Sequence, residues 1–350
     1  MNNRRRHRSV QVLGLVGLAV LLALLVTQKD FASEDDRNAP MVRTLSDGRS
    51  GLFYFRSHSL DRYDVVRDRT RREPVAISAR LDLPGAARDL LKVPAAVLLH
   101  GSDGLTELQT RYARALVERG VATLVIDSFS GREIQSTIGN QNILAADAMV
   151  VDAYAALALL STHPRIDSQS IAVIGWSKGG IASLWSARKS FRRRFATTGQ
   201  QFAAHVAFYP WCGEREADIA LTGAPLLVLS GALDDWSGAR PCIDYVEQAK
   251  MAGYDARIVV YQNAHHGFDY DGSFHTFLPR AVNWSECVYF ARQTGFTVAN
   301  SGWFSPWPDL NRYLGRCSSQ GTHVASNSRA RQRVKSDLFG FLSSVLMSRG

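Results

Sequence analysis

The sequence predicts an α/β fold in which helices cover both faces of a mostly parallel, doubly wound β-sheet. Short apolar runs with the length of buried strands alternate with longer segments of helical periodicity through most of the chain. The chain has 350 residues, of which 46% are hydrophobic and 21% are charged, so it can bury one large core. No internal repeat is visible. These observations favour a single α/β domain that spans residues 51–350.

The expected elements follow one another in a regular order. We expect strands at 74–83, 96–99, 122–126, 171–174, 205–210, 225–230 and 258–261, and helices at 108–119, 144–161, 242–251 and 329–347, with a further helix after residue 179. Gly120 ends the first helix, because glycine readily adopts the backbone that follows a helix C-terminus. The last helix carries Val334, Leu338, Phe341, Leu342 and Val345 on one stripe, so we expect it to dock on the sheet.

The most informative motif is Gly175-Trp176-Ser177-Lys178-Gly179, which follows the apolar run Ile171 to Ile174. A G-x-S-x-G pentad carries chemistry when a strand delivers the serine into a sharp turn and a helix leaves it, since that corner exposes the hydroxyl above the sheet. We expect both the strand before Ser177 and the helix after it. The alternative is an ordinary glycine-rich turn between a strand and a helix.

Two later loops supply partners for Ser177 in the order nucleophile, acid, histidine. Asp234 follows the strand 225–230, and a carboxylate there lies at the edge of the sheet where ligands gather. Its neighbour Asp235 is a rival for the acid. His265 and His266 follow the strand 258–261, and because they alternate in direction in an extended segment, only one faces the serine. We choose His266, and no zinc-like ligand spacing accompanies the pair.

The loop after the strand 96–99 reads His100-Gly101-Ser102-Asp103-Gly104. A loop at this place contributes one backbone N–H to the oxyanion hole, and the residue after the nucleophile contributes the other. We therefore assign the hole to the amides of Ser102 and Lys178. We expect the Lys178 side chain to be a solvated group at a helix N-terminus rather than a substrate-binding cation.

Together these segments resemble the dienelactone hydrolase family of α/β-hydrolases. The matching pieces are HGSDGL, VIDSFSGRE, THPRIDSQSIAVIGWSKGG, FYPWCG, GALDDW and HHGFD, which span residues 75–270 in the order of the family. The resemblance implies an α/β-hydrolase fold and cleavage of a small-molecule ester or lactone by Ser177, His266 and Asp234, without metal or organic cofactor. The founding members use cysteine where this chain has Ser177, which favours general carboxylic-ester hydrolysis. An exported serine peptidase and a ligand-binding scaffold without turnover are the alternatives.

The N-terminus has the charge layout of an export signal. A basic flank at 1–9 precedes an apolar run at 10–26, and 27–50 is polar enough to be a linker. We expect an uncleaved signal anchor in the inner membrane with the catalytic domain in the periplasm or outside the cell, and cleavage with release into the periplasm as the alternative. Because no nucleic-acid recognition motif is present, the net charge of +9 does not indicate nucleic-acid binding.

Export permits disulfides, and the four cysteines allow three pairings. We favour Cys212 with Cys242 and Cys287 with Cys317; a cytosolic domain would instead keep four free thiols. The second pair lies within an irregular insertion at 274–326 that is rich in aromatic residues. This insertion either forms a lid or wall of the acyl pocket or covers the edge of the sheet. The sequence does not determine the oligomeric state.

Overall fold

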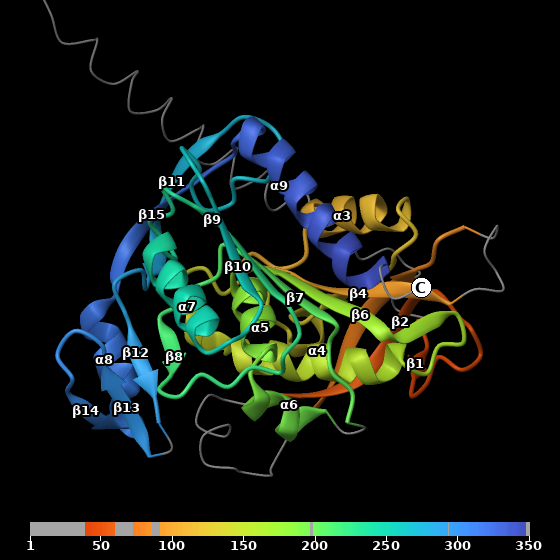
Figure 1. The fold of residues 1–350 in the computed structure, drawn as a ribbon, viewed down its shortest axis with the longest axis horizontal. Coiled ribbons are helices and arrows are strands. Elements are labelled where there is room, and N and C mark those ends of the chain that lie inside the picture. Colours follow the sequence, from red (N-terminus) through yellow and green to blue (C-terminus); the bar gives the residue numbers. More distant parts are fainter. Residues whose placement is uncertain (1–38, 60–72, 86–91, 197–198, 293, 348–350) are drawn as a thin grey trace, which may run out of the picture.

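The computed structural model describes residues 39–59, 73–85, 92–196, 199–292 and 294–347. Its centre is a nine-stranded sheet in the order β1-β2-β3-β5-β4-β6-β7-β9-β10. The strands from β5 to β10 in this order pair in parallel, whereas β3 is antiparallel to both of its neighbours. Figure 1 shows helices on both faces of this sheet. The predicted fold class is therefore confirmed.

The elements of the large sheet and its helices have the following bounds. The strands are β1 (Met41–Val42), β2 (Gly51–Ser59), β3 (Glu73–Asp82), β4 (Val93–Leu99), β5 (Ala122–Asp127), β6 (Ile166–Trp176), β7 (Ala204–Phe208), β9 (Leu226–Gly231) and β10 (Ala256–Tyr261). The helices are α3 (Glu107–Val117), α4 (Ala146–Leu160), α5 (Lys178–Ser186), α6 (Lys189–Phe195), α7 (Ala239–Met251) and α9 (Ser328–Leu342).

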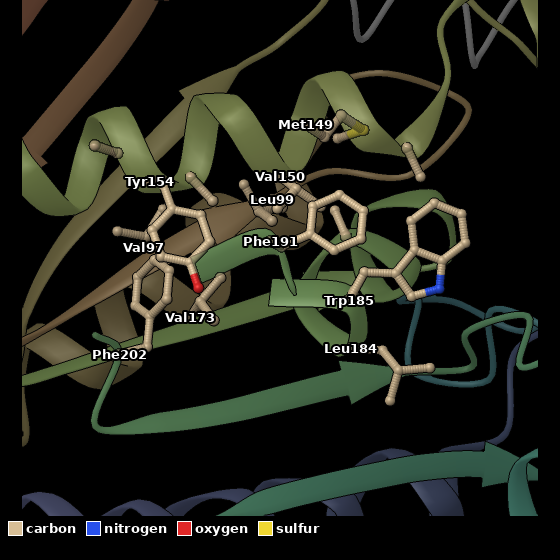
Figure 2. Packing of buried hydrophobic residues seen from close by; sticks show 14 of the residues in the cluster. Val97, Leu99, Met149, Val150, Tyr154, Val173, Leu184, Trp185, Phe191 and Phe202 are labelled. Carbon is tan, nitrogen blue, oxygen red and sulfur yellow. The ribbon is translucent and has the colours of Figure 1, made fainter. Parts of the chain in front are cut away.

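Alternation along the central strands divides the core between the two faces of the sheet. In β4, Val97 and Leu99 pack on the side of α4, while Leu98 packs on the side of α3 and α9. Figure 2 shows the first of these layers, where Tyr154 of α4 lies over the strands. Strands that are buried on both faces explain the continuous apolar runs of the sequence. The apolar stripe of α9 docks on the sheet as predicted.

The domain begins earlier than predicted. Met41 and Val42 form β1, which pairs in parallel with β2, and the side chain of Leu45 is fully buried. The described part of the predicted linker 27–50 therefore belongs to the fold, because its apolar residues fill the edge of the core. The apolar run 10–26 lies outside the described residues. Within the described ranges, no helix has both the length and the apolar character needed to cross a membrane.

The insertion 274–326 is not irregular, which corrects the prediction. β11 (His275–Asn283) pairs with β15 (Ser319–Ala325), and β12 (Tyr289–Ala291), β13 (Gly295–Val298) and β14 (Phe304–Pro306) extend a small sheet that includes β8 (Glu214–Glu216), with α8 (Leu310–Cys317) beside it. Figure 1 shows this second sheet as a lobe beside the main one. Its strands have only three or four residues each, and β8 lies more than seventy residues before its partner β12, so they leave little local signal.

Two disulfides link this part of the molecule, and both have the predicted pairing. Cys212 is bonded to Cys242, and Cys287 is bonded to Cys317. The first joins the loop after β7 to α7, and the second joins the segment just before β12 to the end of α8. One bridge therefore fixes the loop after β7 to α7, and the other cross-links two parts of the insertion that follows β10.

Candidate active site

Ser177 stands at the corner between β6 and α5. Its φ of 53° lies in the left-handed region, which a residue other than glycine rarely adopts. The corner is held by its own backbone, because the Ser177 N–H donates to the Phe208 carbonyl at 2.9 Å and the Ile181 N–H donates to the Ser177 carbonyl at 2.9 Å. The predicted strand-to-helix turn is thus present, with a strained serine at its apex.

Two glycines of the pentad let the start of α5 lie close to the end of β6 and to the end of β4. A Cβ at Gly175 would lie 2.0 Å from the Gly179 carbonyl oxygen, and a Cβ at Gly179 would lie 2.4 Å from that of His100. Both distances are far below any real contact of a Cβ atom. The corner therefore requires glycine at both positions because the backbone leaves no room for a side chain.

The structure brings together the serine, histidine and carboxylate that the sequence analysis selected. His266 Nε2 lies 2.9 Å from Ser177 Oγ, and His266 Nδ1 lies 3.0 Å from Asp234 Oδ2. The other carboxylate oxygen of Asp234 accepts hydrogen bonds from the N–H groups of Trp236 at 3.0 Å and Ser237 at 2.9 Å. His266 and Asp234 are both buried. This arrangement orients the imidazole towards the serine hydroxyl.

The two rival residues have other partners. Asp235 accepts from Thr322 Oγ1 at 2.7 Å and contacts His323 Nδ1 at 2.7 Å, both on β15. Burial opposes ionisation of Asp235, but the hydrogen bonds from His323 and Thr322 outweigh it and lower the pKa. The His265 ring packs against His275 with centroids 4.8 Å apart, and burial lowers the pKa of His265. Neither rival has a contact with Ser177 among these interactions.

Within the described ranges, no group of three or more histidine, cysteine, aspartate or glutamate side chains is arranged to hold a metal ion.

The two residues assigned to the oxyanion hole lie beside Ser177. Ser102 follows β4 and Lys178 begins α5, and both line the same small cavity as the nucleophile. The Ser102 carbonyl accepts from the Thr137 N–H at 2.8 Å, and its hydroxyl donates to Gln141 Oε1 at 3.1 Å. These bonds hold the loop after β4 against the segment before α4.

The prediction that Lys178 is solvated is wrong. Its residue is only 3% exposed, and its Nζ donates to the carbonyls of Gln141 at 2.9 Å and Leu144 at 2.6 Å. These carbonyls lie more than thirty residues away in sequence. A helix N-terminus is usually solvated, and only the tertiary fold brings this loop over the lysine.

His100 is a residue that the sequence analysis quoted without giving it a role. The Ser128 N–H donates to His100 Nε2 at 3.1 Å, and His100 Nδ1 lies 2.8 Å from the Gly101 carbonyl. An acceptor Nε2 requires the proton on Nδ1, so the imidazole is the neutral Nδ1–H tautomer and donates to Gly101. His100 thereby connects the loop 100–104, here called the oxyanion loop, to the residue that follows β5.

Asp269, the last residue of the segment HHGFD, was not predicted to have a role in the site. Its buried carboxylate accepts from Trp176 Nε1 at 2.9 Å, Tyr112 Oη at 2.9 Å and Tyr209 Oη at 2.8 Å. Burial raises the pKa of Asp269, and these three donors oppose the rise. The ring of Tyr209 packs on His266 with centroids 4.6 Å apart. The carboxylate therefore braces the residue before the nucleophile and a ring beside the histidine.

A cavity of about 560 Å³ adjoins the small cavity of about 30 Å³ at Ser177. Both are lined by Gln141, Lys178, Ile181, Trp211 and Trp284. Trp284 belongs to the insertion, which thus forms one wall of the cavity. Other aromatic residues of the insertion do not take part, since Trp303 is 70% exposed and Trp307 is buried among core residues.

The chain is similar to one known protein family and to several solved structures. The sequence profile of the dienelactone hydrolase family matches residues 77–293, more than half of the chain. Among solved structures, the native esterase Est2 of the Planctomycetes species Thermogutta terrifontis has a TM-score of 0.45 and 16% identity, over 56% of this chain and 80% of its own. The same esterase phosphorylated by paraoxon has a TM-score of 0.44 and 16% identity, over 56% and 81%. No curated protein matches the chain.

Proposed function

We propose that this chain, which belongs to the dienelactone hydrolase family, is a serine ester hydrolase of α/β-hydrolase fold in which Ser177, His266 and Asp234 carry the reaction. The observation that supports this assignment most is the continuous hydrogen-bonded row from Asp234 through His266 to Ser177. Its two distances, 3.0 Å and 2.9 Å, fall in the range required for proton transfer between a nucleophile and its base.

The reaction proceeds in two acyl-transfer steps. Ser177 Oγ attacks the ester carbonyl carbon while His266 Nε2 accepts the hydroxyl proton, and Asp234 keeps the other imidazole proton on Nδ1. The tetrahedral intermediate carries its negative charge towards the amides of Ser102 and Lys178, and each such donor contributes roughly 3 to 4 kcal/mol. His266 then gives its proton to the leaving alcohol. Water repeats the sequence, which releases the acid and restores the serine.

Ser177→Ala tests the assignment. Removing the nucleophile of a triad costs on the order of a millionfold in kcat, so we expect turnover of an activated ester such as p-nitrophenyl acetate to vanish. Labelling by a fluorophosphonate should vanish with it. Ser190→Ala is the matched control, because Ser190 is exposed on α6 and its hydroxyl donates to Glu216, far from the candidate site, in the described part of the chain. Full activity or full labelling in the Ser177 variant would refute the assignment.

We propose further that the domain acts outside the cytoplasm and is held at the inner membrane by residues 10–26. The support is the pair of disulfides, since such bonds form and persist in oxidising compartments. Protease added to spheroplasts should digest the catalytic domain, and washing with high salt should leave it with the membrane. Protection from the protease would exclude this location, and recovery in the soluble periplasmic fraction would favour cleavage.

A further inference from the structure

The large cavity beside Ser177 is much bigger than a small ester requires. Its volume of about 560 Å³ is within the range of sites that bury most of a drug-sized ligand, roughly 300 to 1,000 Å³. The cavity at the nucleophile holds only about 30 Å³. Because the two share five wall residues, a group attached to the reacting carbonyl passes from the small space directly into the large one.

Three of the fifteen described residues that line the large cavity are tryptophans, and six more are aliphatic. Trp185 of α5, Trp211 after β7 and Trp284 of the insertion all line the large cavity. The rings of Trp211 and Trp284 lie 5.3 Å apart and inclined by 59°, and Trp211 Nε1 donates to the Trp284 carbonyl at 2.8 Å. This bond fixes the two rings relative to each other. Such a wall stabilises ring-shaped apolar groups by contact area and by aromatic packing.

The charges at this wall disfavour a cationic ligand. Lys178 and Arg132 both line the cavity, whereas no carboxylate is among its described lining residues. Arg132 donates to both oxygens of Asp152, at 2.8 Å and 2.9 Å, so it is neutralised within the protein. Tryptophan cages often bind quaternary ammonium groups, but the described lining residues include no carboxylate that would pair with a cationic ligand. The wall therefore suits an uncharged group.

We propose that this cavity takes an uncharged, ring-bearing apolar group of the ester, and that Trp284 sets the preference for it; this inference rests on the proposed function. Trp284 lines both cavities, so it stands where the ring leaves the reacting carbonyl and enters the larger space. The insertion after the catalytic histidine thus contributes to substrate selection rather than to the chemical step.

Three esters that differ in one group test the proposal by titration of the released acid. They are ethyl acetate, ethyl 2-naphthylacetate with the ring on the acyl side, and 2-naphthylmethyl acetate with the ring on the alcohol side. We expect kcat/KM for one of the naphthyl esters to exceed that for ethyl acetate by tenfold or more. Equal or lower values for both naphthyl esters would overturn the proposal.

Variants separate a specific wall from a general effect on folding. Trp284→Ala should lower the naphthyl preference at least fivefold, Trp284→Phe should retain most of it, and Trp303→Ala should leave it unchanged, because Trp303 is exposed elsewhere in the same insertion. An equal loss on all three esters in Trp284→Ala and Trp284→Phe would refute the selective role. Failure of wild type to hydrolyse any ester, with Ser177 unlabelled, would instead refute the proposed function.

A last pair of substrates tests the charge. Acetylcholine and its neutral analogue 3,3-dimethylbutyl acetate have nearly the same shape and differ by one positive charge. We expect the neutral ester to have the higher kcat/KM, by threefold or more. A preference for acetylcholine would overturn the uncharged character that the wall assigns to the group.

Discussion

Adding one methyl group at Gly179 tests how the corner at Ser177 controls the oxyanion loop. In the present backbone, the Cβ of Gly179→Ala would lie 2.4 Å from the His100 carbonyl oxygen and 2.5 Å from that of Leu99. Both obstacles are backbone atoms, so no side chain can turn away to make room. Either α5 or the end of β4 must move by more than about half an ångström.

The magnitude follows from two opposing effects. Overpacking of this kind costs about 1 to 3 kcal/mol, and alanine recovers up to about 1 kcal/mol in a helix. We therefore expect a modest loss of stability. The effect on rate is larger, because Leu99 and His100 lead directly to the oxyanion loop and Lys178 precedes the altered residue. A misplacement of about 1 Å in such a site costs on the order of 100-fold in kcat/KM.

The assay compares kcat/KM on p-nitrophenyl acetate with the melting temperature of each variant. Gly340→Ala is the matched control, because Gly340 lies in α9 with open space around its Cβ position. That variant should gain about 0.5 to 1 kcal/mol in stability and keep its activity. If Gly179→Ala stays within threefold of wild type in kcat/KM, the close approach does not control the site and the reasoning fails.

Three further predictions concern stability. Replacing Cys212 and Cys242 together by serine should cost about 3 to 4 kcal/mol, since the bridge spans 30 residues; an unchanged urea midpoint would contradict this. Burial lowers the pKa of His205 from 6.5 to about 3. As the pH falls, the unfolded chain therefore binds a proton at His205 before the folded protein does. The contribution of neutral His205 to the free energy of unfolding is fully present above pH 6.5 and is lost as the pH falls towards 3. His205→Gln should reduce the slope of unfolding free energy against pH by about 1.4 kcal/mol per pH unit between pH 6 and 4, and equal slopes in urea titrations would reject it. Asp269→Asn leaves at least one buried donor without an acceptor, so it should cost about 1 to 3 kcal/mol and lower kcat more than it raises KM; kinetics and melting curves both unchanged would exclude the bracing role.

The residues of the candidate site were predictable because a local sequence pattern indicates each of them. The pentad around Ser177 combines a buried strand with glycines that only a tight corner needs, and Asp234 and His266 each follow a strand. In a parallel sheet the C-terminal ends of the strands meet at one edge, so these three loops converge there. The chain order of the motifs then assigns a role to each residue.

The choice between neighbours depended on contacts that are distant in sequence. Asp235 is excluded from the pair with His266 because Thr322 and His323, almost ninety residues later, bind it. Lys178 is buried because the loop before α4 lies over it. The sequence favoured Asp234, which contacts His266 in the structure, but neither of these two distant contacts could be anticipated from it.

By itself the sequence determined the alternation of strands and helices, the corner at Ser177, the chain order of the candidate catalytic motifs and the possible pairings of the cysteines. Only the tertiary structure decided that β1 joins the sheet, that the insertion forms a second sheet with β8, and that Trp284 walls the cavity beside the nucleophile. The physical reason is the separation in sequence over which each effect acts. Backbone preferences and hydrophobic periodicity act between residues a few positions apart, whereas a cavity wall or a short edge strand exists only when distant segments pack together.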